Sequence, residues 1–222
     1  MIVPRAVILP LALLVALSTT TLLFSAGVGT APSAFMGDAN VVLGPASGEA
    51  IGVQPVDATL VPALRAIPTV RAASAEIYLP TVIDGRSVFA RGVDFEDFVG
   101  FERARLVDGR APQASDEAVV GVGLARQLGV EVGDRLVLPS PFARLALPFT
   151  VVGRLDSDTA ARDELFVPLE PARVLGHLAA THVHLVRLRA DDPLAVSPTL
   201  RSVAPTFTLS DVRVSTEDLV PG

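Results

Sequence analysis

A long uncharged run near the amino end places the strongest constraint on what this chain can fold into. No charged residue occurs between Arg5 and Asp38, and Ala6–Val28 is a run of twenty-three mostly apolar residues. As a helix that run would be about 35 Å long, which is enough to cross a lipid bilayer. Because Arg5 precedes the run, the amino end is expected to stay in the cytoplasm. We therefore expect a single-pass anchor in the cell membrane, with the bulk of the chain extracytoplasmic.

A cleaved signal peptide is the alternative interpretation of the same run. Small residues that could form a cleavage site occur at Ser25-Ala26-Gly27 and at Ser33-Ala34. The run is long for the apolar core of a signal peptide, so we favour the uncleaved anchor. Both interpretations place the remainder of the chain outside the cytoplasm.

The composition excludes several classes of function. The net charge is −6, with no tryptophan and one tyrosine. This argues against a nucleic-acid partner, because phosphate binding needs clustered cations and base stacking needs aromatic rings. All eighteen basic residues are arginine, so this chain has neither a P-loop lysine nor a Schiff-base lysine. Cysteine is absent as well, which removes thiol nucleophiles and disulfides.

The middle of the chain alternates short strands, turns and helices. Ala118–Leu138 reads as a strand, a glycine turn, a short helix that Gly129 ends, and a strand entered through Gly133-Asp134. Further elements are predicted at Phe149–Leu155 (strand), Leu165–Leu169 (strand) and around Ala172–Leu175 (helix). The core of this part is expected to contain Leu124, Leu128, Val151 and Leu165.

Segments on both sides of this middle part predict a second set of elements. The expected strands are Asn40–Gly44, about Val70–Ile83, Ser87–Val93, His182–Arg189 and Thr206–Val214. Asp57 or Thr59 can cap a helix that ends at Ile67, and Asp192 can cap another that ends near Val203. Asp84-Gly85 is a strong hairpin signal between two of the strands.

The order of these elements predicts an α+β fold in two parts behind a transmembrane helix. Residues 1–37 would hold a cytoplasmic tip and the membrane helix. Residues 38–94 together with 177–222 would form an outer β-α-β-β…β-α-β domain. Residues 95–176 would form a small β-rich domain inserted in its middle.

Four motifs follow one another between Glu117 and Leu175. They are E-A-V-V-G, L-A-x-x-L-G-V-x-V-G-D-x-L-x-L, F-T-V-V-G-x-L and F-V-P-L-E-x-A-x-x-L. Their order and spacing together resemble ABC transporter permeases of the MacB/FtsX type, and more narrowly the MacB-like periplasmic core domain. The resemblance covers roughly residues 6–215, including the first transmembrane helix.

The resemblance implies a function in transport. Such a permease works as a homo- or heterodimer and couples a separate ATPase to export or to other extracytoplasmic events. Its extracytoplasmic domain contacts its counterpart, a substrate or a partner protein. Since the later transmembrane helices of the family are missing here, we expect a truncated form. The alternative is a membrane-tethered binding or adaptor domain without transport activity, and neither hypothesis makes the chain an enzyme.

Gly121-Val122-Gly123 follows a strand and precedes a helix, as the start of a dinucleotide-binding loop would. Arg126 occupies the position of the third small residue of that motif, and no complete βαβ unit surrounds it. We therefore interpret these glycines as a turn that needs positive φ angles.

The histidines and the densest group of carboxylates are the remaining candidates for a site. His182 and His184 would share one face of a strand, with His177 nearby, but convincing further metal ligands are lacking. Asp156, Asp158, Asp163 and Glu164 do not have the spacing of a calcium loop, so a solvated turn is expected. We assign no catalytic, cofactor-binding or metal-ligating residue and expect no cofactor.

Overall fold

A computed structural model describes residues 39–43, 55–102 and 104–192. The chain divides into two compact units, Met1–Met36 and Gly37–Gly222, and every described residue belongs to the second unit. The predicted transmembrane helix, the predicted helix after Asp192 and the last predicted strand lie outside the described residues. Within the described ranges, no helix is both long enough and apolar enough to cross a membrane.

The described part is mostly sheet. Its strands are β1 (Val41–Leu43), β2 (Val56–Asp57), β3 (Val70–Ile83), β4 (Arg86–Val93), β5 (Ala104–Gly109), β6 (Glu117–Gly121), β7 (Arg135–Pro139), β8 (Ala146–Ser157), β9 (Glu164–Pro168), β10 (His182–Val183) and β11 (Leu185–Ala190). Its helices are η1 (Ala58–Leu60), α2 (Val61–Arg65), α3 (Phe95–Phe101), α4 (Val122–Leu128), η2 (Ala160–Asp163) and α5 (Leu169–Leu175). The mixed α and β class is therefore confirmed.

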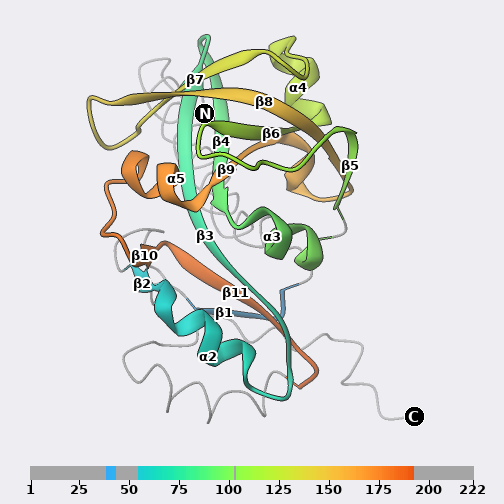
Figure 1. Cartoon of the computed structure of the whole chain (residues 1–222), viewed down its shortest axis with the longest axis vertical. Helices are drawn as coiled ribbons and strands as arrows, with labels where there is room; N and C mark the ends of the chain where they lie inside the picture. Colours follow the sequence, from blue (N-terminus) through green and yellow to red (C-terminus); the bar gives the residue numbers. More distant parts are fainter. Residues whose placement is uncertain (1–38, 44–54, 103, 193–222) are drawn as a thin grey trace, which may run out of the picture. The chain divides into compact units, whose positions relative to one another are not determined.

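One sheet connects nearly all of these strands (Figure 1). Its order is β1-β11-β3-β4-β9-β6-β8-β5, β7 adds to β8, and β2 and β10 form a separate pair. The β4–β9 and β6–β8 pairs are parallel, whereas the other pairs are antiparallel. The β4–β9 pair is the strand pairing that joins β1, β11, β3 and β4 to the strands of residues 95–176.

Strand β3 passes through both halves of the sheet. Its first half pairs with β11 and its second half with β4, and Glu76 has a partner on both sides, Leu185 and Val93. In Figure 1 β3 runs from α2 to the β7–β8 hairpin. A single strand of 14 residues therefore links the two parts that the sequence predicts as outer and inserted domains.

The sheet curls until β7 returns to β3. The hydroxyl of Thr81 on β3 donates to the carbonyl oxygen of Pro139 on β7 at 2.8 Å. Strands β3, β4, β9, β6, β8 and β7 thereby enclose an apolar core, as in a partly closed barrel. Its fully buried side chains include Leu79, Ala90, Val120, Leu138, Val151 and Leu165.

Local turn chemistry was predicted correctly at several positions. The hairpin residues Asp84 and Gly85 both have positive φ angles, 49° and 75°, as a type I′ turn requires. Gly129 ends α4 in the left-handed conformation with φ 69°, and the side chain of Asp57 caps η1 by accepting from the Thr59 amide. Each prediction rested on residues adjacent in sequence.

Two expectations were wrong in detail, and two elements were not predicted. The single strand expected at His182–Arg189 is broken at His184, because β10 pairs with β2 whereas β11 pairs with β1 and β3. Leu128 was expected inside the core but is only partly buried against it. Helix α3 and strand β5 were not anticipated, and β5 is an exposed strand without clear alternation of polar and apolar residues.

Candidate functional site

Five charged residues form a buried cluster between the two parts of the sheet: Glu76, Arg91, Glu102, Glu164 and Arg187. Glu76, on β3, lies at its centre. Arg187 Nε donates to Glu76 Oε1 at 2.6 Å, and Arg91 Nη1 donates to Glu76 Oε2 at 3.0 Å. All five residues are at most 6% exposed. One buried carboxylate thus pairs with two buried guanidinium groups.

Each arginine also reaches a carboxylate that follows residue 95 in the chain. Arg91 Nη2 donates to Glu164 Oε1 of β9 at 2.7 Å. Arg187 forms an ion pair with Glu102, the residue directly after α3. Glu76, Arg91 and Arg187 come from β3, β4 and β11, so the two ion pairs cross from one part of the sheet to the other.

Aromatic rings surround the guanidinium groups of the cluster. The Cζ atom of Arg91 lies 4.9 Å from the ring centre of Tyr78 and 5.4 Å from that of Phe98. The Cζ atom of Arg187 lies 4.7 Å from the ring centre of Phe101. Such cation–π contacts strengthen when water is excluded. Helix α3, which supplies both phenylalanines, therefore covers the cluster.

The carboxyl groups of the cluster differ in their electrostatics. Burial alone would raise the pKa of Glu76, but the guanidiniums of Arg187 and Arg91 outweigh burial and hold that pKa below its ordinary value. Burial raises the pKa of Glu164, and Arg91 offsets this only in part. Burial also raises the pKa of the Tyr78 phenol, whose hydroxyl donates to Glu76 Oε2 at 2.9 Å.

The sequence interpretation did not identify this cluster. Glu102 receives no role in the sequence analysis, and Glu164 is predicted there in a solvated turn. The available signal was the presence of Glu76, Arg91 and Arg187 within otherwise apolar strands. Charged residues in buried strands are almost always paired, so these three could have been proposed as partners.

The predicted acidic turn is correct for Asp158 and Asp163 but wrong for Asp156 and Glu164, which lie in β8 and β9. Asp158 and Asp163 are exposed, and Asp156 accepts from Arg162 Nη1 at 2.7 Å. Glu164, by contrast, begins β9 and is 2% exposed. The expectation was wrong there because the strand starts one residue before the apolar run that reveals it in the sequence.

The glycines at positions 121 and 123 are required by close packing. Gly121 has φ −64° and precedes α4, so the expected positive φ angle is wrong there. A Cβ atom on Gly121 would lie 2.3 Å from the carbonyl oxygen of Arg162, and one on Gly123 would lie 2.0 Å from Asp163 Oδ1. These glycines allow η2 to pack against α4.

The three histidines occupy different environments. His177 has a positive φ angle of 53° just after α5. His182 is a partly exposed residue of β10, whereas His184 is buried and its Nδ1 accepts from the Tyr78 amide at 2.9 Å. Across the described ranges, no group of three or more His, Cys, Asp or Glu residues could hold a metal ion.

A cleft of about 420 Å³ opens where the parallel strands β4 and β9 end. Asp94 and Glu96, at the start of α3, supply the charged side chains among the described residues that line it. Gln113 and Ser115 add polar groups from the β5–β6 loop, and Pro168 of β9 also lines the cleft. The cleft can therefore accept hydrogen bonds from a cationic or polar group of a bound partner.

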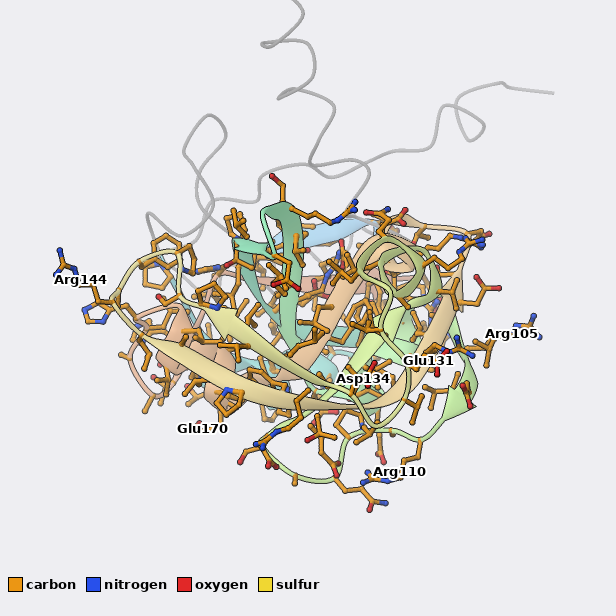
Figure 2. All side chains as sticks on the ribbon, turned by 90° about the horizontal axis from the view of Figure 1, so that it is seen from above. Arg105, Arg110, Glu131, Asp134, Arg144 and Glu170 are labelled. Carbon is orange, nitrogen blue, oxygen red and sulfur yellow. The ribbon has the colours of Figure 1, made fainter. Side chains whose placement is uncertain are left out.

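Exposed arginines contrast with the two in the cluster. Figure 2 shows Arg105 and Arg144 projecting outward from the ribbon, on opposite sides of the view. Arg110 is also exposed and forms an ion pair with Glu117. Surface pairs of this kind contribute little to stability, so the buried cluster is the distinctive electrostatic feature of the described residues.

Comparison with solved structures identifies related folds. The periplasmic region of MacB from Actinobacillus actinomycetemcomitans has a similar structure, with a TM-score of 0.58 and 14% sequence identity over 82% of this chain and 94% of that chain. The extracellular domain of the noncanonic ABC-type transporter YknZ from Gram-positive bacteria matches with a TM-score of 0.55 and 12% identity, over 77% of this chain and 98% of that chain. At these identities the two structures show a shared fold.

A family model decides the assignment. No curated protein matches the sequence, but the model of the MacB-like periplasmic core domain matches residues 7–206. This range confirms the resemblance seen in the four motifs, and the family is one of transporter permease domains, not of enzymes. The chain belongs to the family of MacB-like periplasmic core domains and provides an extracytoplasmic domain of the ABC transporter permease type.

Proposed function

We propose that this domain couples ATP hydrolysis by a separate ATPase to export or to another extracytoplasmic event. Members of the family are components of ABC transporter permeases, which work with ATPase subunits. The observation that carries the proposal is the extent of the family match, which begins at residue 7, inside the predicted membrane span. Because one family model covers both the predicted span and the outer domain, the two are suited to transmit movement across the membrane together.

We infer that the anchor is residues 6–28 and that the permease to which this domain belongs has further membrane helices. A single span offers no pathway for cargo and little surface in the cytoplasm for an ATPase. Those helices would lie in a longer polypeptide or in a partner subunit. The apolar run and the family match support the anchor.

We further propose that residues 38–94 with 177–222 act as one body and residues 95–176 as an inserted one. The two bodies would be joined by β3, by the β4–β9 pair and by the buried charged cluster. Coupling between distant sites needs elements that move as units. A strand of 14 residues that enters both bodies is suited to carry a displacement from α2 to the β7–β8 hairpin.

Permease subunits of this type are proposed to pair as homo- or heterodimers and to contact an extracytoplasmic partner. Exposed apolar side chains support a contact near β7. Val137 is 58% exposed on β7, and Phe142 is 56% exposed in the loop that follows. We propose that a partner covers these two side chains, because exposed apolar surface can mark an interaction site.

Purification of the native complex tests the proposed coupling. The gene would be tagged in its own host, so that the complete polypeptide is recovered from solubilised membranes. An ABC ATPase is expected to copurify and to hydrolyse ATP in the complex. Recovery of extracytoplasmic proteins without any ATPase would refute the coupling and support the membrane-tethered adaptor instead. Replacing Leu13 and Val15 with arginine provides the control, because it should release the domain from the membrane fraction.

A further inference from the structure

The buried cluster contains more acidic than basic groups. Its carboxyl groups are Glu76, Glu102 and Glu164, and its guanidinium groups are Arg91 and Arg187. If all five were ionised, the cluster would carry one unbalanced negative charge. A buried charge without a partner is costly, and such a group usually becomes neutral instead. The charge balance therefore calls for one bound proton.

Hydrogen bonding distinguishes Glu164 from the other two carboxyl groups. Both oxygens of Glu76 are engaged by Arg187, Arg91 and the Tyr78 hydroxyl. Glu102 forms an ion pair with Arg187. Glu164 Oε1 accepts from Arg91, but its Oε2 is buried without a hydrogen-bond partner among the described residues. An unpartnered buried oxygen costs less when its carboxyl group is neutral.

Among the described residues, the groups packed around Glu164 do not supply a cation that pairs with it alone. Strand β4 presents Arg91, which Glu164 shares with Glu76 of β3, and β11 presents Arg187, which is engaged by Glu76 and Glu102. Tyr78, also on β3, is neutral, and α3 presents the ring of Phe98 to both arginines. In η2, Arg162 is paired with Asp156 and Asp163 contacts Gln127.

We propose that this cluster is a proton-binding site and that Glu164 carries the proton at neutral pH. With that proton the cluster has no net charge and its two cross-sheet contacts remain intact. Loss of the proton places a second full charge beside Glu76 and weakens the contact between β4 and β9. This proton site is independent of the proposed transport function.

The direction of the pKa shift agrees with this geometry. Burial raises the pKa of Glu164 above that of an unfolded glutamate. The folded protein therefore binds more protons than the unfolded chain between the two pKa values. Stability from this group is complete below the unfolded pKa and is lost as the pH rises through the folded pKa.

Unfolding of the full chain in detergent tests the proposal. The Glu164→Gln variant mimics the protonated side chain, and the Glu170→Gln variant, on the exposed Glu170 labelled in Figure 2, is the matched control. From about pH 5.5 towards the folded pKa, the unfolding constant of the wild-type protein should rise by about tenfold per pH unit relative to Glu164→Gln. The Glu170→Gln variant should follow the wild-type protein throughout. A constant difference between wild type and Glu164→Gln at all pH values would overturn the proposal.

Infrared spectroscopy supplies a second readout, and its first outcome needs only the wild-type protein. A protonated carboxyl group gives a carbonyl band separate from that of carboxylates. At neutral pH this band is expected in the wild-type protein and in Glu170→Gln, and its absence from the wild type would refute the bound proton. If the band persisted in folded Glu164→Gln, the proton would belong to another carboxyl group and the assignment would be wrong.

Discussion

Gly92 of β4 and Ala172 of α5 are in direct contact. A Cβ atom on Gly92 would lie only 2.1 Å from the Cβ atom of Ala172 and 3.2 Å from that of Ile77. Helix α5 can therefore pack on β4 only because residue 92 has no side chain. Ser140 reinforces this position, since its hydroxyl donates to the carbonyl oxygen of Leu175 at 2.6 Å.

The Gly92→Ala substitution is expected to destabilise the domain by about 1–3 kcal/mol, which is typical of overpacking in a filled core. Urea unfolding would measure the change. A Gly92→Ala, Ala172→Gly double variant should recover part of the loss, because it removes the colliding methyl group. If the double variant were less stable than the sum of the single effects predicts, the proposed contact would be wrong.

Glu76 is expected to be the most sensitive residue of the buried cluster. Glu76→Gln removes the charge that both Arg91 and Arg187 share, and breaking a buried ion pair typically costs about 3–5 kcal/mol. Denaturant unfolding at neutral pH would measure this loss. Glu131→Gln makes the same chemical change at an exposed position and should leave stability nearly unchanged, so similar effects at both sites would contradict the cluster's role.

Burial predicts different costs for two leucines of α4. Leu124 is 2% exposed, so Leu124→Ala should cost about 2–5 kcal/mol. Leu128 is only partly buried, and Leu128→Ala should cost less because its side chain is already partly hydrated. Thermal or urea unfolding of the two variants provides the comparison. An equal or larger loss at Leu128 would mean that α4 packs through a different face.

Features that depend on neighbouring residues could be predicted from the sequence, whereas the strand order that assembles the buried cluster could not. Asp84-Gly85 and Gly129 specify their own backbone conformations, so the hairpin and the end of α4 followed directly. Glu76 and Arg187 are 111 residues apart, and Arg91 and Glu164 are 73 apart. These residues meet only because β3 lies between β11 and β4, and β4 lies beside β9. That strand order results from the whole core and leaves no local sequence signal.

The interruption between β10 and β11 at His184 also depends on contacts that are distant in sequence. Alternation of polar and apolar residues predicts one strand through this position. Tertiary pairing overrides it, because the His184 amide donates to the Glu76 carbonyl oxygen and its ring accepts from the Tyr78 amide. Both partners lie on β3, more than 100 residues away in sequence.

His184 should make the domain sensitive to mild acid. Burial lowers the pKa of His184 below its ordinary value of 6.5, so the unfolded chain binds this proton more readily. Its contribution to stability is complete above about pH 6.5 and is lost as the pH falls through the folded pKa. In unfolding experiments across this pH range, His184→Asn should reduce the fall in the free energy of unfolding at acid pH. The matched His182→Asn variant should show the same fall as the wild-type protein. An unchanged fall in His184→Asn would exclude His184 as the cause.

The apolar run at residues 6–28 predicts that the chain resists alkaline extraction from membranes. Replacing Leu13 and Val15 with arginine should abolish this resistance, since each charge near the centre of a span costs about 2.5–3.5 kcal/mol on insertion scales. Immunoblotting of the pellet and supernatant measures the distribution of the chain. Recovery of a shortened wild-type chain in the supernatant would contradict the anchor and support a signal peptide cleaved near Ser25-Ala26-Gly27. A full-length chain that stays in the pellet, together with a released arginine variant, is the result that the anchor requires.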